Sequence, residues 1–170
     1  FPTVIHGISG YSGGGRQLIE AFEGQGDAPT SDNYRLYGLG LSHKHLPEMQ
    51  HYSGLSHAPL FFPAVGRFRQ GMLVQVPLNL GALQKRPGSA DIHGLLSEAY
   101  AGQRHVQVQP LAEQPPARLE PEALNGTNDL EIFVFGNDAL GQVLLVARLD
   151  NLGKGASGAA VQNLELMLGL

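Results

Sequence analysis

The chain has 170 residues, of which 42% are hydrophobic and 15% charged, and its 11 basic and 15 acidic side chains give a formal net charge of −4. This length suits one domain with a sizeable core, and the composition excludes an intrinsically disordered chain. The acidic balance disfavours nucleic-acid binding, no apolar run is long enough to span a bilayer, and the lack of cysteine excludes disulfides and a thiol nucleophile among these residues. We therefore expect neither a nucleic-acid nor a membrane partner. The composition leaves the compartment open, and a cytoplasmic protein is the default expectation.

Along the chain, segments whose apolar residues have the period of a strand are mixed with segments that have the period of a helix. Strands are predicted over residues 3–9, 34–41, 72–80, 105–109, 130–135 and 142–149, and helices over 16–23, 46–53, 90–101 and 156–168, with a short apolar segment at 60–65. The strands 130–135 and 142–149 read as a hairpin across 136–141. With an antiparallel pair and no strict alternation of strands and helices, residues 1–170 are predicted to form a single α+β domain without a linker.

Two residues predict local details of these elements. Pro77 lies inside the alternating segment 72–80 and cannot donate a backbone hydrogen bond, which predicts an edge strand or a bulge there. Ser89 precedes the helical pattern at 90–101 and is a predicted N-cap, because its hydroxyl can accept from a free N–H of the first turn.

The first candidate cluster spans His6 to Arg16 and contains five glycines. Glycine lets the backbone approach a ligand closely, and successive N–H groups can surround an anion. Arg16 adds a planar cation suited to phosphate or carboxylate. The cluster therefore suits either a ligand-binding loop or a tight turn before a helix, and its spacing is not that of a P-loop.

The second cluster is His43-Lys44-His45-Leu46-Pro47-Glu48. Two histidines separated by one residue point the same way in an extended segment, and a nearby carboxylate can orient an imidazole. This pattern suits general acid–base catalysis, and with His51 or His57 added it also suits a metal site. A set of solvated surface histidines is the third interpretation.

Two further segments contain candidate binding residues. Arg67 and Arg69 flank Phe68 before a strand, where they suit an anionic substrate or a solvated strand entry. The segment 150–163 places glycines and Asn151 at the opening of a helix, whose N-terminus favours anions. The Gly, Ala and Ser residues of that helix indicate close packing against another surface.

These clusters, taken in order, resemble the second, catalytic and dimerisation domain of N-acetyl-gamma-glutamyl-phosphate reductase, and the resemblance spans nearly the whole chain. It is carried by the segments Ser9–Arg16, His43–Met49, Phe68–Met72 and Asp150–Ala156. The form Leu-Ser-His-Lys-His-Leu-Pro-Glu at 41–48 is similar to the shorter, second type of this enzyme. The motif that runs from Asp150 to Asn163 is the most specific.

The resemblance implies a fold and a reaction. Family members are similar to glyceraldehyde-phosphate and aspartate-semialdehyde dehydrogenases, whose second domain has a mixed, mostly antiparallel sheet with helices on one face. An N-terminal Rossmann domain binds NADP, and the final helix, here about 156–170, packs on that domain. In the implied reaction a cysteine thiolate attacks an acyl phosphate, phosphate leaves, and NADPH reduces the thioester to N-acetylglutamate semialdehyde.

The resemblance also implies roles for particular residues. His45 is the acid–base candidate, with His43 beside it and Glu48 as the residue that orients it. The candidates for substrate contact are Arg16, Arg69 and Ser12, and the candidates for cofactor contact are Ser9, Gly10, Asn151 and Lys154. No metal ligand is implied, and the family suggests a homo-oligomer, either a dimer or a tetramer.

The chain departs from the family pattern in two respects. It contains no cysteine, and it contains no dinucleotide-binding fingerprint. In the family both lie upstream of the region that the chain resembles. We therefore expect this chain to be the second half of an enzyme and to be inactive alone, with NADP bound mainly by the missing domain.

Three other functions remain open from the sequence. The chain suits a related semialdehyde dehydrogenase that acts on another acyl phosphate. It also suits a non-catalytic dimerising module. A histidine-based metal protein is the third alternative.

Overall fold

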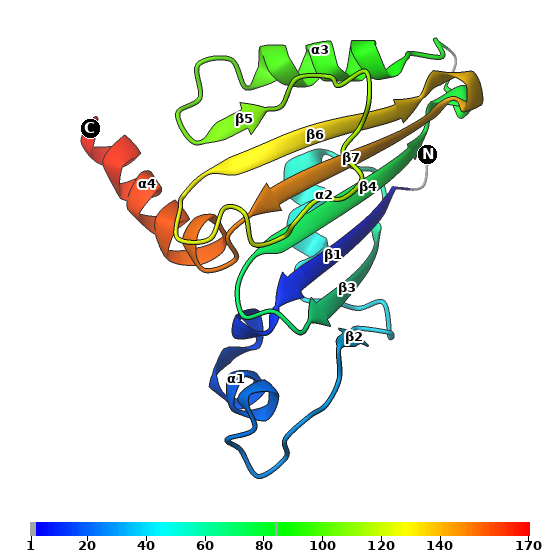
Figure 1. Ribbon diagram of the computed structural model, residues 1–170. Coiled ribbons are helices and arrows are strands. Elements are labelled where there is room, and N and C mark those ends of the chain that lie inside the picture. Colours follow the sequence, from blue (N-terminus) through cyan, green and yellow to red (C-terminus); the bar gives the residue numbers. More distant parts are fainter. Residues whose placement is uncertain (1–2, 84) are drawn as a thin grey trace.

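The protein forms one seven-stranded sheet with helices beside it (Figure 1). The computed structural model describes residues 3–83 and 85–170. The strands are β1 (Val4–Gly10), β2 (Tyr34–Leu36), β3 (Leu60–Gly66), β4 (Met72–Asn79), β5 (Val106–Val108), β6 (Leu130–Asn137) and β7 (Gln142–Leu149), and the helices are α1 (Gly15–Glu23), α2 (Leu46–Ser53), α3 (Ser89–Ala99) and α4 (Gly158–Leu168). No helix in the described ranges has the length and apolar character needed to cross a membrane.

The strand order is β2-β3-β1-β4-β7-β6-β5. Strand β1 pairs in parallel with β3, and β5 pairs in parallel with β6. The other neighbours, β2 with β3, β1 with β4, β4 with β7 and β6 with β7, run antiparallel. The predicted α+β class and the mixed, mostly antiparallel sheet that the resemblance implies are therefore confirmed.

The register of the strands places the helices on one face of the sheet. Val134, Leu145 and Val76 lie opposite one another in register and share this face with Leu78 and Val143, because directly opposed and alternate strand residues point the same way. Helix α3 packs Ile92 and Leu96 on these residues and buries Leu80, Val134 and Val143. Burial of this apolar area drives the packing of α3 on the sheet.

The segment before α2 lies over the same face at the other side of the sheet. Phe61 of β3 is opposite Ile5 of β1, which places Phe61 on the face that α3 covers. The ring of His43 packs edge-on against Phe61 at 5.2 Å. Figure 1 shows α2 behind β1 and β4. One face of the sheet therefore carries both α2 and α3.

The structure changes several predicted details. The strand predicted over 34–41 contains only Tyr34–Leu36, because the chain turns at Gly38, whose φ is +68°. Ser89 is the first residue of α3 rather than its cap; Gly88 is the cap, and the carboxylate of Asp91 accepts from the Gly88 N–H. Pro77 was predicted to mark an edge strand or a bulge, but it lies in β4, a central strand of the sheet. Pro77 pairs with Leu144 of β7, whereas the pairing of β4 with β1 covers only residues 72–75.

Two further boundaries differ from the predictions. The hairpin strands extend to Asn137 and resume at Gln142, so the loop is shorter than the predicted 136–141. The C-terminal helix begins with one π-helical turn over Gly153–Ser157, and α4 follows from Gly158. The apolar segment 60–65, for which no element type was predicted, is the strand β3.

The predicted candidate clusters meet at one end of the sheet. Strands β1, β3 and β7 end there, and β2, β4 and β6 begin there. Figure 1 shows the beginnings of both α1 and α4 beside this end. The sheet therefore brings together loops that are separated by as many as 139 residues.

Candidate functional site

A cavity of about 690 Å³ lies at this end of the sheet, on the face that carries α2. Its floor is formed by residues of β1, β3 and β4, including Gly7, Phe61 and Met72. Its walls come from the glycine-rich loop after β1, from the segment between β2 and α2, and from Gly155 of the π-helical turn. Among the predicted site residues, Ser9, Gly10, His43 and His45 line this cavity.

The two predicted histidines are adjacent and differ in their surroundings. Their rings lie 5.1 Å apart, and the backbone N–H of His45 donates to His43 Nδ1 at 3.3 Å. His45 caps α2, and its Nδ1 lies 2.9 Å from Glu48 Oε2 in the first helical turn. Pro47 occupies that turn, as predicted, where no backbone donor is needed. This arrangement places the Nδ1 of His45 against a carboxylate, as an orienting residue requires.

The cavity perturbs two of its titratable side chains. Burial lowers the pKa of His43 below its ordinary value of 6.5, and the charges of His45 and Lys44 lower it further. Burial likewise raises the pKa of the Tyr37 phenol. The lowered pKa favours the neutral form of the His43 imidazole near neutral pH. The centre of its ring lies 6.1 Å from that of Tyr37.

Close backbone packing explains the glycines of the first cluster. A Cβ atom on Gly10 would lie 2.5 Å from the Arg69 carbonyl oxygen, and the Gly10 N–H donates to Gly71 O at 2.9 Å. A Cβ atom on Gly13 would lie 3.1 Å from Ser9 Oγ and 3.4 Å from Asn151 Nδ2. The glycine-rich loop is therefore pressed against two other loops and also forms a wall of the cavity.

Asn151 connects three segments of the site. Its Oδ1 accepts from the backbone N–H of Gly71 at 2.8 Å, and its Nδ2 donates to Ser12 Oγ at 3.1 Å. Ser12 is buried, and its hydroxyl faces Asn151 rather than the cavity. Two predicted contact residues thus also hold the loops of the site together.

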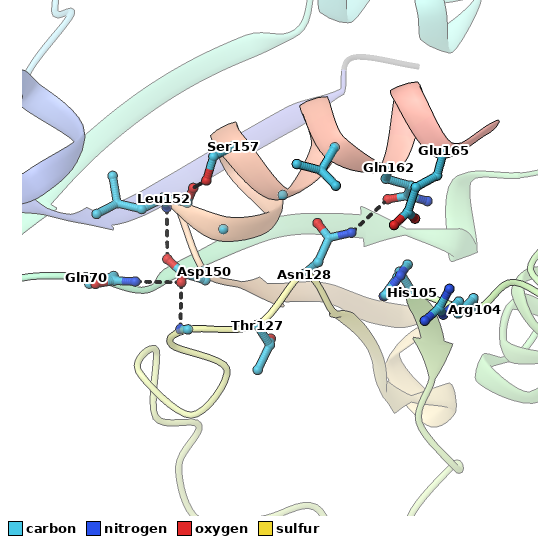
Figure 2. A pocket seen from close by; sticks show the side chains of 14 residues that line it. Gln70, Arg104, His105, Thr127, Asn128, Asp150, Leu152, Ser157, Gln162 and Glu165 are labelled. Carbon is cyan, nitrogen blue, oxygen red and sulfur yellow. Dashed lines mark hydrogen bonds between the residues drawn. The ribbon is translucent and has the colours of Figure 1, made fainter. Parts of the chain in front are cut away.

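Asp150 is the most buried charged side chain of the described part, with 1% of its surface exposed. Its carboxylate accepts from the N–H groups of Leu152 and Gly126 and from Gln70 Nε2, at 2.6–2.8 Å (Figure 2). Burial alone would raise the pKa of Asp150, but these hydrogen bonds outweigh burial and lower the pKa. The charged form of Asp150 therefore anchors the turn that carries Asn151.

Lys154 belongs to a different environment from the other predicted cofactor residues. Its Nζ donates to Gln162 Oε1 at 2.6 Å, and Asn128 Nδ2 donates to the same oxygen at 3.1 Å. Gln162 and Asn128 line a second cavity of about 510 Å³, shown in Figure 2. Burial lowers the pKa of Lys154, and the charge of Asp129 opposes that effect. The structure does not bring Lys154 to the cavity lined by Ser9 and Gly10.

The predicted arginines also lie outside the lining of the 690 Å³ cavity. Arg16 has a side chain that is 90% exposed and pairs with Glu20, and Arg69 pairs with Glu23. Arg67 donates to the backbone carbonyls of Phe22, Thr30 and Asp32. Arg67 is therefore a structural residue that holds the loop after α1.

Sequence reasoning did not identify Arg35, Tyr37 and Lys44 as lining residues. In the sequence, Arg35 and Tyr37 belong to the predicted strand 34–41 and carry no predicted role, and Lys44 lies between two candidate histidines. The position of Arg35 in a predicted strand is the one signal in the sequence. That signal does not identify a cavity residue until the register shows which face of the sheet Arg35 lies on. These three side chains add two cations and a phenol to the cavity lining that contains His43 and His45.

The metal-site interpretation finds no geometric support in the described residues. No group of three or more His, Asp or Glu side chains in ranges 3–83 and 85–170 is arranged to hold a metal ion. His51 packs edge-on against the ring of Tyr52, and His57 Nδ1 lies 2.9 Å from Ser56 Oγ. These two histidines therefore do not complete a ligand set with His43 and His45.

Known proteins resemble the chain over nearly its full length. N-acetyl-gamma-glutamyl-phosphate reductase from Burkholderia cenocepacia is 52% identical over 170 residues, covering 99% of this chain and 54% of the relative. N-acetyl-gamma-glutamyl-phosphate reductase 2 from Nostoc sp. is 52% identical over 178 residues, covering 100% of this chain and 55% of the relative. The chain thus spans about half the length of these relatives.

Solved structures show the same fold at low sequence identity. Aspartate semialdehyde dehydrogenase II from Vibrio cholerae superposes with a TM-score of 0.69 at 14% identity, over 98% of this chain and 54% of that one. A probable aspartate-semialdehyde dehydrogenase from Pseudomonas aeruginosa gives a TM-score of 0.69 at 17% identity, over 98% and 55% of the two chains. The sequence profile described as "Semialdehyde dehydrogenase, dimerisation domain" matches residues 2–151. The chain therefore belongs to the semialdehyde dehydrogenase dimerisation-domain family.

Proposed function

We propose that this domain supplies the acid–base and substrate-binding side of an NADP-dependent reductase that converts N-acetyl-glutamyl phosphate to N-acetylglutamate semialdehyde and phosphate. The observation that carries the proposal is the meeting of His43 and His45 with Ser9 and Gly10 around one cavity. The names of the relatives at 51–53% identity support the choice of substrate. A related dehydrogenase of another acyl phosphate is the alternative.

In this proposal His45 exchanges a proton with the reacting groups. Its Nδ1 lies against Glu48, so its Nε2 is the atom available to take the proton of a thiol or to donate to the oxyanion of a tetrahedral intermediate. A cysteine thiolate attacks the carbonyl carbon of the acyl phosphate, the carbon–oxygen bond to phosphate breaks, and a thioester remains. His43 supports His45 as a neutral neighbour, since burial lowers its pKa.

The nicotinamide cofactor supplies the hydride that reduces the thioester when it is bound. Ser9 and Gly10 line the cavity and fit contact with its carboxamide end, and Asn151 lies next to Ser9 beside Gly13. Gly13 leaves the space beside Ser9 Oγ and Asn151 Nδ2 that a Cβ atom would fill. Asn151 Nδ2 uses one hydrogen on Ser12, which leaves the other for a ligand. Ser12 supports the site from outside the cavity through Asn151, whereas Lys154 binds Gln162.

The proposal divides the reaction between this chain and residues outside it. The 170 residues contain no cysteine, so the thiol belongs to another segment, as does most of the NADP site. The isolated chain is then inactive. The exposed apolar residues of α4, which include Val161, Leu164 and Met167, are proposed to pack on the cofactor domain.

The test is turnover by the full polypeptide that carries these residues. The reverse reaction is followed as NADP reduction with N-acetylglutamate semialdehyde and phosphate. His45→Gln is expected to lower kcat about 10²–10⁴-fold, as loss of a general acid–base does. Glu48→Gln is expected to lower it less, because Glu48 acts through His45. His57→Gln is the matched control, since His57 lies outside the cavity.

The outcomes separate the competing functions. Turnover of this substrate by the full polypeptide and none by the 170-residue chain supports the divided site. If the full polypeptide turns over only another semialdehyde, the related dehydrogenase is favoured. If it turns over no semialdehyde, a non-catalytic dimerising module is favoured. Full activity of His45→Gln would contradict the acid–base role.

The family description further supports a homo-oligomer. The sheet face opposite α2 and α3 carries Tyr34, Leu36, Leu60 and Leu144, which are exposed apolar side chains. An exposed apolar sheet face of this kind marks an interaction surface. This face is the proposed contact with a second copy of the chain.

A further inference from the structure

The cavity has an unusual charge balance for this chain. Its lining contains the cation Arg35, the cation Lys44 and the histidines His43 and His45, and no Asp or Glu of the described residues lines it. The whole chain has more acidic than basic side chains, 15 against 11. A concave site lined by charges of one sign attracts ligands of the opposite sign.

Arg35 is held in position before any ligand binds. It lies on β2 opposite Val65, and so it points to the face of the sheet that forms the cavity floor. Its Nε donates to Asp32 Oδ2 at 2.8 Å, its Nη2 to Thr30 Oγ1 at 3.2 Å, and its guanidinium lies 5.7 Å from the ring centre of Phe22. No hydrogen-bond partner of Nη1 is found among the described residues. A guanidinium fixed in this way loses little entropy when it binds an oxyanion.

Asp32 partly neutralises Arg35, but the lining of the cavity keeps a net positive charge. It is the one carboxylate paired with Arg35 in the described part, and it does not itself line the cavity. Lys44 lies on the loop before α2 and lines the cavity without an ion-pair partner among the described residues. Burial and the charge of His45 are the larger causes of the lowered pKa of His43, and the charge of Lys44 adds to them.

The glycine-rich loop adds a third source of positive potential. Gly13 and Gly14 line the cavity and directly precede α1, whose first turn contains no acidic side chain. The dipole of a helix N-terminus favours an anion, although the first N–H of α1, that of Gly15, donates to Ser12 O. Gly13, Gly14 and Arg35 line the same cavity, so the potential of the helix end adds to that of the guanidinium.

We propose that Arg35 and Lys44 form an oxyanion subsite in this cavity that binds either the phosphoryl group or the carboxylate of the substrate. The inference rests on the proposed function for the identity of the substrate. It assigns the oxyanion contact to cavity-lining cations, in place of Arg16 and Arg69, which pair with glutamates outside the lining.

The test measures anion binding and turnover in the full polypeptide. Inorganic phosphate and N-acetylglutamate are titrated separately by calorimetry into the wild type, Arg35→Gln, Lys44→Gln and the control Arg118→Gln. Arg118 is a matched control, because it pairs with Glu120 on the surface, away from the cavity. Loss of one charged hydrogen bond is expected to weaken binding about tenfold or more, and Arg118→Gln is expected to bind as the wild type does.

Arg35→Lys and Lys44→Gln distinguish a loss of anion binding from a folding defect. Arg35→Gln removes contacts with Asp32 and Thr30, so circular dichroism and thermal unfolding accompany each titration. Arg35→Lys keeps the charge but removes the planar fork, and partial recovery of affinity relative to Arg35→Gln is expected. Lys44→Gln removes no contact of the described structure, and its fold is expected to be unchanged.

Each outcome decides the proposal. Weaker phosphate binding alone assigns the subsite to the phosphoryl group, and weaker N-acetylglutamate binding alone assigns it to the carboxylate. Unchanged affinity for both anions in either folded variant, or a wild type that binds neither, would overturn the proposal. Anion binding that depends on Arg35 and Lys44 without turnover of N-acetyl-glutamyl phosphate would refute the proposed function and leave the subsite intact.

Discussion

The side-chain amide of Asn151 donates to the hydroxyl of Ser12 at 3.1 Å, across 139 residues of sequence. The same side chain accepts from the backbone of Gly71 at 2.8 Å, so one residue ties the end of β7 to the loops after β1 and before β4. Such a shared contact fixes the relative positions of three loops. The geometry of the candidate site therefore depends on residues that do not line its cavity.

Gly10→Ala is expected to destabilise the protein by about 2–3 kcal/mol, because the added methyl group would lie 2.5 Å from the Arg69 carbonyl oxygen, which belongs to the backbone. Gly94→Ala is the matched control. Gly94 lies exposed in α3, an added Cβ meets nothing within 4 Å, and alanine favours a helix by about 0.5–1 kcal/mol. Urea unfolding checks both variants; equal stabilities would show that Gly10 is not constrained by packing.

Asp150→Ala is expected to cost about 3 kcal/mol or more at neutral pH, because it leaves buried donors from Leu152, Gly126 and Gln70 without an acceptor. Chemical denaturation of the variant and of Asp27→Ala, an exposed aspartate, measures the difference. A cost for Asp150→Ala no greater than that of the control would show that the hydrogen bonds do not stabilise the turn.

The contribution of Asp150 is also expected to depend on pH. Its native pKa lies below the ordinary 3.8, so the unfolded chain binds more protons than the native protein near that pH. The stabilisation is therefore complete above the ordinary pKa and is lost as the pH falls through the native value. The difference between wild type and Asp150→Ala should narrow in acid, as denaturation over a series of pH values would reveal. A constant difference would contradict the lowered pKa.

The imidazole of His43 is expected to titrate below 6.5, since burial is the main cause of its shift and positive neighbours add to it. Lys44→Gln should raise this pKa only in part, because burial and His45 remain. NMR titration of the imidazole resonances, assigned through His43→Gln, measures the value in both proteins. A pKa at or above 6.5 in the wild type would mean that the cavity is wetter than its lining indicates.

Leu144→Asp is expected to weaken the proposed self-association about a hundredfold or more, because it buries a carboxylate in an apolar contact. Leu144 is 37% exposed on the sheet face opposite the helices, whereas Leu95 is 64% exposed on α3. Leu95→Asp is therefore the matched control and should keep the oligomeric state. Light scattering after gel filtration gives the masses; an unchanged mass for Leu144→Asp would exclude this face as the contact.

Much of the fold follows from local pattern. The alternation in 72–80 and the helical spacing in 90–101 predicted β4 and α3 closely, because each element buries one apolar face. The strand at 34–41 was predicted too long, since its glycines at 38 and 40 suit both a strand interruption and a turn. Only the positive φ of Gly38 in the folded chain decides between them.

The sequence by itself determined the α+β class, the clusters around His43 and His45, and the resemblance that the relatives confirm. Only the tertiary structure decided that Arg35 and Lys44 line the cavity, that Arg16 and Arg69 pair with glutamates elsewhere, and that Lys154 turns toward Gln162. A period of two assigns strand residues to alternate faces but does not say which face a helix or a loop will cover. That choice depends on strand order and register, which are set by contacts between residues far apart in the chain.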